Sequence, residues 1–277
     1  MCKTLILMAT YNGEKYIDAQ LESIAKQNQK PNYILIRDDG STDKTYEKIA
    51  KFTQQNADIK IDLVKNKTNL GWRENFQKLM RDASNYDVDY VFFSDQDDFW
   101  HPEKIREQVE IMESNHRINL LSSNFEIKKI SKNATIPRKY TGGIVDGKPL
   151  NEDFTLTNGK VRKVKWDDIR GHFVMNAFVM CARKDFIDNV VNKFYIGSPA
   201  VAHDKMLTAL AGTTHSYFVY DKILVDWLRH DDNTSSGGTK FDSLSEIDDY
   251  YSRQQTYYDT LKKYTEFLLQ KEKNDRK

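Results

Sequence analysis

Short apolar runs alternate with segments of helical periodicity through the first half of the chain, and this alternation limits the available folds more than any other feature. The run Thr4–Ala9 is continuous, which is typical of a strand buried on both faces, and Tyr33–Arg37 and Tyr90–Phe93 are also expected strands. Ile59–Lys65 and Ile118–Ile127 are two further expected strands. Strict alternation of strand and helix predicts an α/β fold with a mostly parallel sheet and helices on both faces.

The second half of the chain is less regular. We expect strands at Phe173–Cys181, Tyr217–Tyr220 and Ile223–Leu228, and a helix over Asp204–Ala211 that Gly212 ends. Beyond a Gly/Ser-rich joint at residues 235–238, apolar residues recur at spacings near three and four. This periodicity predicts a long amphipathic helix as a C-terminal extension.

Charge and cysteine content exclude several classes of protein. Lys+Arg is 42 and Asp+Glu is 41, so the balance gives no electrostatic case for a nucleic-acid partner. The two cysteines, Cys2 and Cys181, are far apart in sequence, which indicates free thiols in a reducing compartment. We see no signal peptide and no apolar run of about 18 residues. We therefore expect a cytoplasmic protein, or one peripheral at the inner face of the plasma membrane.

The densest acidic motif is Ser94–Asp98, directly after the expected strand Tyr90–Phe93. Three carboxylates within four residues repel one another, and a bound divalent cation removes that cost. Oxygen ligands suit Mg²⁺ or Mn²⁺ held together with a substrate's phosphates. The alternative is a solvated acidic turn, but the preceding strand aims the cluster at the carboxyl edge of the sheet, where ligands of such folds bind.

Two other expected strands also end in polar motifs. Asp38–Asp43 follows the second strand and Thr10–Gly13 follows the first. The adjacent carboxylates of Asp38 and Asp39 are suited to accept hydrogen bonds from a base or ribose, and Tyr11 can stack on a base. The chain has neither a Gly-x-Gly-x-x-Gly motif nor a Walker loop, so dinucleotide binding and ATP hydrolysis lack support.

These motifs occur together with Asn69–Gly71 and Asp95–Asp98, and in this order they resemble glycosyltransferase family 2, whose members have the Rossmann-like GT-A fold. The resemblance is close over residues 3–127 and looser through residue 238. It implies a nucleotide-sugar donor. It also implies that the donor-binding residues are Thr10, Tyr11, Asn12, Asp38, Asp39, Asn69, Gly71, Asn75, Asp95 and Gln96.

The resemblance also implies a metal site and a catalytic base. Asp97 matches the metal-binding position of the family's Asp-x-Asp motif, with Asp95 at the ribose or at a metal-bound water, and His230 matches a downstream metal ligand. Asp204 matches the carboxylate base at the start of a helix, with helix capping as its alternative role. The family usually has Glu or Asp before this base, so His203 is a departure. Acceptor-binding candidates are Asp98, Trp100 and His203.

The segment Ser94–Trp100, together with Arg229, His230, Asn233 and Ser235, is similar to bacterial rhamnosyltransferases. This similarity implies inverting transfer of L-rhamnose from dTDP-β-L-rhamnose to a lipid-linked saccharide in cell-wall or capsular polysaccharide synthesis. One alternative is the same fold with a UDP-hexose or UDP-N-acetylhexosamine donor. Another is a non-catalytic module that binds a nucleotide and a metal.

The expected organisation has three parts. Residues 1–127 form a nucleotide-sugar-binding half, and residues 128–238 form the acceptor-binding and catalytic half of the same domain. Residues 239–277 form the helical tail, which can rest on a membrane surface, pair with a second copy of the chain, or pack against the catalytic domain.

Overall fold

The computed structural model describes most of the chain, and the two halves of the expected domain share one sheet. The described residues are 2–134, 143–145, 148–149, 159–165, 175–195, 201–233 and 244–275. The expected Gly/Ser-rich joint at residues 235–238 lies outside them. None of the helices within these ranges is long and apolar enough to cross a membrane.

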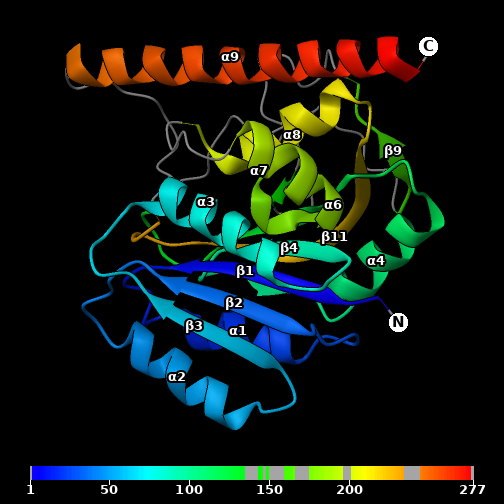
Figure 1. Ribbon diagram of the computed structural model, residues 1–277. Helices are drawn as coiled ribbons and strands as arrows, with labels where there is room; N and C mark the ends of the chain where they lie inside the picture. Colours follow the sequence, from blue (N-terminus) through cyan, green and yellow to red (C-terminus); the bar gives the residue numbers. More distant parts are fainter. Residues whose placement is uncertain are drawn as a thin grey trace.

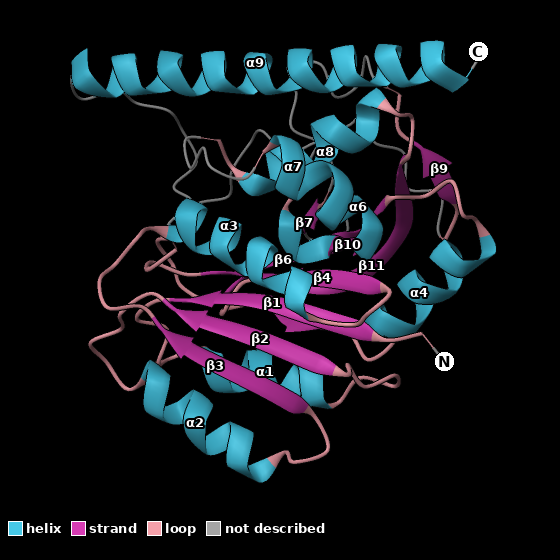
Figure 2. Ribbon diagram, viewed as in Figure 1, coloured by secondary structure: helices cyan, strands magenta, loops and turns pink. Residues whose placement is uncertain are grey.

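The first half contains the predicted alternation (Figures 1 and 2). Its strands are β1 (Thr4–Thr10), β2 (Tyr33–Asp38), β3 (Lys60–Lys65), β4 (Tyr90–Ser94), β5 (Phe99–Trp100) and β6 (Leu120–Lys129). Its helices are α1 (Ile17–Ala25), α2 (Thr45–Gln55), α3 (Trp72–Asp82), a short 3₁₀ turn (Ala83–Asn85) and α4 (Lys104–Ser114). Figure 1 shows α1 and α2 on one face of the first three strands and α3 on the other, as the sequence predicts.

The second half adds the elements that follow β6 in the chain. Its strands are β7 (Ile144–Val145), β8 (Lys148–Pro149), β9 (Val161–Lys163), β10 (Met180–Arg183) and β11 (Tyr217–Arg229). Its helical segments are a 3₁₀ turn (Ala177–Val179), α6 (Lys184–Phe186), a π-helical turn (Ile187–Val191), α7 (Asn192–Phe194), α8 (His203–Thr213) and α9 (Leu244–Asp275).

The sheet is mixed but mostly parallel, in the order β3-β2-β1-β4-β10-β6-β11-β5. Strand β10 runs antiparallel to both β4 and β6, while β1, β2, β3 and β4 are parallel neighbours. Thr10 pairs with Asp38, and Met8 pairs with Ser94, so β1, β2 and β4 end at the same edge. The predicted fold class is confirmed, and the register gathers the three polar motifs at one edge.

Burial explains why the apolar runs became strands. Every residue of Leu5–Met8 and of Tyr90–Phe93 is fully buried, because helices cover both faces of these strands. On α3, Phe76, Leu79 and Met80 form the buried stripe that anchors the helix to the sheet. These side chains belong to one continuous hydrophobic core that includes residues of both halves.

Three expectations in the second half were wrong in detail. Tyr217–Arg229 is one strand rather than two, with a register shift against β6 where we expected a break. Only the end of Phe173–Cys181 is a strand, because Ala177–Val179 forms a 3₁₀ turn, and residues 173–174 lie outside the described part. Gly212 does not end helix α8 as expected, because the helix continues to Thr213.

The predicted amphipathic tail is the helix α9, which crosses the molecule above α7 and α8 (Figure 1). Tyr257 and Tyr264 are buried on its inner side, and the Tyr264 ring lies 4.9 Å from that of Phe194 in α7. Gln254 accepts a hydrogen bond of 3.1 Å from the Nζ atom of Lys205 in α8. The apolar stripe of the tail therefore packs against α7 and α8.

Candidate functional site

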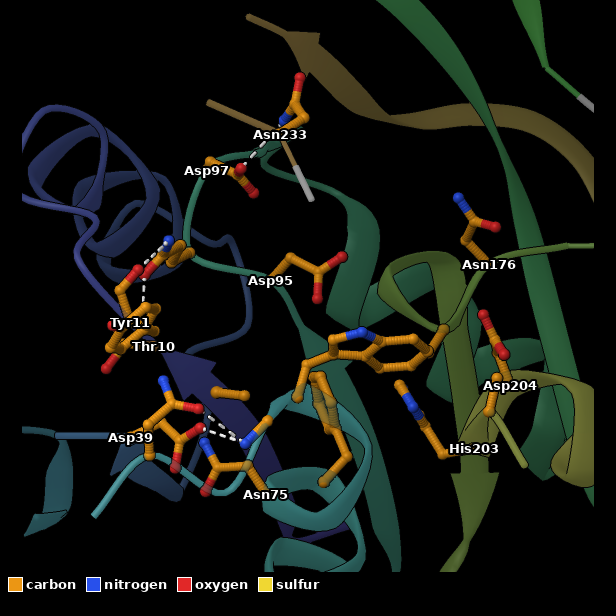
Figure 3. A pocket seen from close by; sticks show the side chains of 18 of the residues that line it. Thr10, Tyr11, Asp39, Asn75, Asp95, Asp97, Asn176, His203, Asp204 and Asn233 are labelled. Atoms are coloured by element: carbon orange, nitrogen blue, oxygen red, sulfur yellow. Dashed lines mark hydrogen bonds between the residues drawn. The ribbon is translucent and has the colours of Figure 1, made fainter. Parts of the chain in front are cut away.

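A cavity of about 670 Å³ opens at the carboxyl edge of the sheet, beyond the ends of β1, β2 and β4. Figure 3 shows Thr10, Tyr11 and Asp39 on one side of it, with Asn176, His203 and Asp204 on the other. The expected site residues among its lining are Thr10, Tyr11, Asp39, Asn69, Gly71, Asn75, Asp95, Gln96, Asp97, His203 and Asp204. The cavity thus receives side chains from both halves of the domain.

Asp38 and Asp39 are both buried, and their carboxylates hold different parts of the site. Asp38 is fully buried, and its carboxylate accepts hydrogen bonds from the Thr10 hydroxyl at 3.1 Å and the Ser41 amide at 2.9 Å. Asp39 accepts hydrogen bonds from the amides of Leu70 at 2.9 Å and Gly71 at 2.8 Å. Asp39 therefore fixes the loop that leads into α3, whereas Asp38 is occupied in holding its own turn.

The loop before α3 needs glycine at one position. Gly71 is the N-cap of α3 and has a φ of 79°, a left-handed conformation that residues with a Cβ rarely adopt. Four residues on, the Asn75 side chain donates to the carbonyl oxygen of Arg37 at 2.9 Å and accepts from the Asn66 amide at 3.0 Å. This part of the wall is rigid because the ends of β2 and α3 are joined by side-chain hydrogen bonds.

Tyr11 and Gln96 join the first and fourth strand ends. The Gln96 side chain accepts a hydrogen bond from the Tyr11 amide at 2.8 Å and donates one to the Tyr11 carbonyl at 3.0 Å. A Cβ atom at Gly13 would lie 2.3 Å from the Gln96 Oε1 atom, so a larger residue there would push the Gln96 side chain out of this position. The Tyr11 ring is 45% exposed at the cavity and is free to stack on a ligand. Asn12, in contrast, uses its side-chain oxygen to accept from the Thr42 amide at 2.9 Å.

The acidic motif after β4 meets a histidine and an asparagine from the end of β11. The Asp97 Oδ2 atom lies 3.0 Å from the His230 Nε2 atom and 3.1 Å from the Asn233 Nδ2 atom, which donates to it. The His230 ring is stacked on Tyr16 with centroids 3.8 Å apart, which fixes its orientation. Figure 3 shows Asp97 and Asn233 facing each other at one end of the cavity.

Asp95 points into the cavity between these two sides (Figure 3). Burial, followed by repulsion from Asp97 and Asp204, raises the pKa of the Asp95 carboxyl to about 8. The carboxyl groups of Asp95, Asp97 and Asp204 therefore line one poorly hydrated cavity and repel one another. A bound cation would relieve this repulsion.

Asp98 and Trp100, two of the acceptor-binding candidates, lie away from the cavity. Both side chains are fully buried, and burial, with Asp97 and Asp95, raises the pKa of Asp98 well above its usual range. Trp100 belongs to the hydrophobic core beneath the acidic loop. Neither has a surface that an acceptor can reach, so we do not carry these two residues into the proposed site.

Asp204 lies in the first turn of α8, where the helix dipole favours a negative charge. Ala202 is the N-cap, so the alternative role of Asp204 as the capping residue is not the one observed. One carboxylate oxygen accepts a hydrogen bond of 2.7 Å from the Lys205 amide. Burial raises the pKa of Asp204 to about 6, opposed by that amide and by Arg73. The group is therefore a base that titrates close to neutral pH.

Asp97 and His230 provide a carboxylate oxygen and an imidazole nitrogen, both of which bind Mn²⁺, and the oxygen also suits Mg²⁺. Across the described ranges, no three His, Cys, Asp or Glu side chains gather as a group able to hold a metal ion. The pair fits a cation that completes its shell with substrate phosphates and water. Asp95 lines the same cavity, but no hydrogen bond joins it to Asp97 or His230 within the described structure.

Several lining residues were not found from the sequence. They are Trp72, Phe76, Asn176, Lys205, Trp227 and Asn233. The pattern assigned Trp72 and Phe76 to the buried stripe of α3, although their spacing placed them directly after the Asn69–Gly71 turn. Asn233 is part of the motif similar to rhamnosyltransferases, but the similarity implies no particular role for it. Asn176 and Lys205 carried no sequence signal, because only the tertiary fold brings them to the cavity.

Two relatives show which proteins this chain is similar to. It is 38% identical over 118 residues to the dTDP-rhamnosyl transferase RfbG of Shigella flexneri, a match over 42% of this chain and 40% of that protein. It is 30% identical over 141 residues to the UDP-Glc:alpha-D-GlcNAc-diphosphoundecaprenol beta-1,3-glucosyltransferase WfgD of Escherichia coli, over 49% of this chain and 52% of that protein. The matched region thus spans about half or less of either relative.

Solved structures establish the GT-A fold. TarS residues 1–349 of S. aureus, in complex with UDP-GlcNAc, has a TM-score of 0.67 at 17% identity, over 93% of this chain and 66% of that one. The mannosyltransferase PcManGT of Pyrobaculum calidifontis, in complex with GDP-Man and Mn²⁺, has a TM-score of 0.54 at 14% identity. The match covers 82% of this chain and 56% of that one. At such identities the likeness concerns the fold alone.

The family assignment comes from the sequence profile described as "Glycosyl transferase family 2". It matches residues 5–189, which include the motifs after β1, β2 and β4. The predicted resemblance is confirmed over that range. The chain belongs to glycosyltransferase family 2.

Proposed function

We propose that this chain is a metal-dependent, inverting glycosyltransferase that moves a sugar from a nucleotide diphosphate to a hydroxyl of a saccharide. The observation that carries the proposal is that Asp97, paired with His230, and Asp204 line one cavity from different halves of the domain. Transfer needs a group that holds the diphosphate and a separate base for the acceptor. The cavity offers both kinds of group.

The nucleotide would occupy the side of the cavity formed by the ends of β1 and β2. There Tyr11 offers an exposed ring for stacking, and Asp39 accepts from the amides of Leu70 and Gly71, which holds this loop at the rim. Asn75 is fixed by hydrogen bonds to Arg37 at the end of β2 and from Asn66 after β3. Of the other expected donor-binding residues, Asn12 and Asp38 would act through the shape of the loops that their hydrogen bonds maintain.

Mg²⁺ or Mn²⁺ would be held by Asp97 and His230, with Asp95 nearby. When bound, the cation neutralises the charge that builds on the departing diphosphate. Asn233 donates a hydrogen bond to the Asp97 Oδ2 atom, and the stacked Tyr16 ring holds the His230 imidazole in place. These contacts preorganise the pair, so that little ordering remains to be done on binding.

Asp204 would act as the general base on the opposite side of the cavity. Its carboxylate takes the proton of the acceptor hydroxyl as that oxygen forms a bond to the anomeric carbon. The bond from the anomeric carbon to the diphosphate oxygen breaks, and the electron pair leaves with the diphosphate. A single displacement inverts the anomeric centre and needs no covalent enzyme intermediate.

The donor that we favour is dTDP-β-L-rhamnose, and the support is the likeness to RfbG. WfgD is named for a UDP-Glc donor, so a UDP-hexose or UDP-N-acetylhexosamine is the alternative. Its name also carries a diphosphoundecaprenol acceptor, which supports a lipid-linked saccharide as acceptor in polysaccharide synthesis. On the tail, the outward-facing Tyr258 and Leu269 are available for a membrane surface or a second copy.

The test is a donor panel with the purified chain. dTDP-rhamnose, UDP-glucose, UDP-GlcNAc and GDP-mannose are compared in MnCl₂, by thermal stabilisation and by release of the nucleoside diphosphate. A ligand at a hundredfold excess over its Kd stabilises by about 2.7 kcal/mol. We expect dTDP-rhamnose to give the largest shift and to be turned over. Stabilisation without any hydrolysis or transfer would instead indicate a non-catalytic binding module.

The tail is tested separately by flotation with anionic liposomes, using the chain with and without residues 243–277. Loss of flotation on truncation supports a membrane contact, whereas concentration-dependent dimers without flotation support a second copy. A monomer that does not float would leave α9 as a purely intramolecular element.

A further inference from the structure

His203 has two ring nitrogens that are buried and have no hydrogen-bond partner in the described structure. Its side chain is 3% exposed, yet it lines the cavity. Buried polar groups are almost always hydrogen-bonded, because an unpaired one forfeits its hydration without return. An unpaired imidazole at the wall of a binding cavity indicates that the missing partner is a ligand.

Three aromatic rings hold this imidazole in one orientation. Phe76 is stacked on it with centroids 3.9 Å apart and planes at 19°, while Trp72 and Phe93 lie with centroids 6.0 Å away. These ring contacts fix the orientation of the imidazole, and its two nitrogens stay without a hydrogen-bond partner within the described residues. His203 also starts α8, which places it directly before Asp204.

The imidazole is neutral at physiological pH. Burial among these rings lowers the pKa of His203 to about 3, so one nitrogen carries a proton and the other is an acceptor. A neutral imidazole with one donor and one acceptor complements a hydroxyl group, which can accept and donate at once. It does not favour a phosphate or a carboxylate, which have no hydrogen to donate at this pH.

We propose that His203 is a specificity-determining residue that hydrogen-bonds a ring hydroxyl of the transferred sugar. The placement follows from the neighbours of His203. Trp72 and Phe76 belong to α3, whose first turn forms the nucleotide side, and Asp204 is the base. In a single displacement the transferred sugar lies between the diphosphate and the base. The inference rests on the proposed function of this cavity.

The test compares His203→Phe with His203→Gln and His203→Asn. Phenylalanine keeps the ring packing and removes both nitrogens, whereas the amides restore a donor and an acceptor. His116→Phe, at an exposed histidine, is the matched control. For each protein the Kd of dTDP and of dTDP-rhamnose in MnCl₂ is measured, with UDP and UDP-glucose as the second pair. The acceptor KM is measured with the donor that is turned over.

We expect His203→Phe to bind dTDP like the wild type and to lose about 5- to 100-fold in sugar-nucleotide affinity and in kcat/KM. At least one amide variant should recover part of the loss. The thermal midpoint of ligand-free His203→Phe should equal or exceed that of the wild type, because the unpaired nitrogens are gone. A role in packing alone would lower the midpoint and leave the ratio of the two Kd values unchanged.

Two outcomes would overturn the inference while the proposed function stands. One is that His203→Phe keeps the same ratio between the Kd of the nucleotide and the Kd of the sugar nucleotide as the wild type. The other is a change confined to the acceptor KM, which would assign His203 to the acceptor. If the wild-type chain binds and turns over none of the sugar nucleotides, the proposed function itself fails and the inference falls with it.

Discussion

The Nε2 atom of His230 lies 3.0 Å from the Oδ2 atom of Asp97, although 133 residues separate them in the chain. The contact follows from the way the acidic loop is held. The loop leaves β4 and enters β5, and β5 pairs with β11 through Trp100 and Val225. His230 follows β11 directly, so strand pairing brings the imidazole to the carboxylate. The candidate metal site is therefore built by the sheet rather than by a local motif.

Replacing Asp97 by Asn should remove metal-dependent turnover. The amide keeps the shape and loses the charge that holds a divalent cation, so we expect kcat/KM to fall at least about 100-fold. Mn²⁺ should no longer increase thermal stabilisation by the donor. Asp87→Asn is the control, because the Asp87 side chain is 92% exposed in a surface ion pair. Unchanged activity in Asp97→Asn would refute the metal role of this carboxylate.

His230→Asn should weaken Mn²⁺ binding about 10- to 100-fold, as is typical for a residue in or beside a metal's ligand set. The binding is measured by calorimetry in the presence of the nucleoside diphosphate. His101→Asn is a matched control, since His101 also pairs with a carboxylate, the Asp226 Oδ1 atom, at 2.8 Å. Equal losses in the two variants would mean that the effect of His230 is structural.

Asp204→Asn should slow transfer and leave donor affinity intact. Loss of a general base costs about 10²- to 10⁴-fold in rate, and the donor is expected to lie on other lining residues. Transfer is followed by product formation, and donor affinity by the Kd of the sugar nucleotide. Collapse of donor binding in this variant would show that Asp204 is structural or donor-binding.

The pKa of Asp204, raised to about 6, predicts an acid limb in the pH profile. Below about pH 6 the carboxyl binds a proton and cannot accept one from the acceptor, so kcat/KM should fall about tenfold per pH unit. Rates from pH 4.5 to 8.5 with a saturating metal concentration provide the measurement. Asp204→Asn should lack this limb, and a wild-type profile that is flat through pH 6 would contradict the assignment.

The same raised pKa of Asp204 also affects stability: activity rises with pH, whereas the free energy of unfolding falls. Between about pH 4 and pH 6 the native state binds more protons at Asp204 than the unfolded chain, so the unfolding free energy falls as pH rises through this window. Urea unfolding of the wild type and of Asp204→Asn should show the variant gaining in relative stability from pH 4 to pH 7. A constant difference between the two proteins would count against the shift.

Docking of α9 can be tested with a pair of tyrosines on the same helix. Tyr264 is 3% exposed against Phe194, and Tyr258 is 61% exposed. We expect Tyr264→Ala to lower the unfolding free energy by about 2–3 kcal/mol, and Tyr258→Ala by less than about 0.5 kcal/mol. Chemical denaturation measures both. Similar small losses would mean that the tail is not packed as the structure shows.

Local sequence was sufficient to place the residues at the ends of the parallel strands near one another. Asp39, Asp95 and Asp97 follow apolar runs that the alternating pattern predicts to be strands, and parallel strands end at one edge. Asp204 was found through the family resemblance rather than through any local pattern. Asn176 and Lys205 could not be found, because neither follows a strand of the parallel set nor carries a motif.

The sequence by itself determined the strand–helix alternation, the family and the acidic motif, since these depend on periodicity and residue type along short stretches. Only the tertiary structure decided which carboxylates face the cavity. It buried Asp38 and Asp98, left Asp95 and Asp97 at the rim, and joined Asp97 to His230. The physical reason is that burial and long-range pairing depend on strand register and helix packing, which no short window of sequence contains.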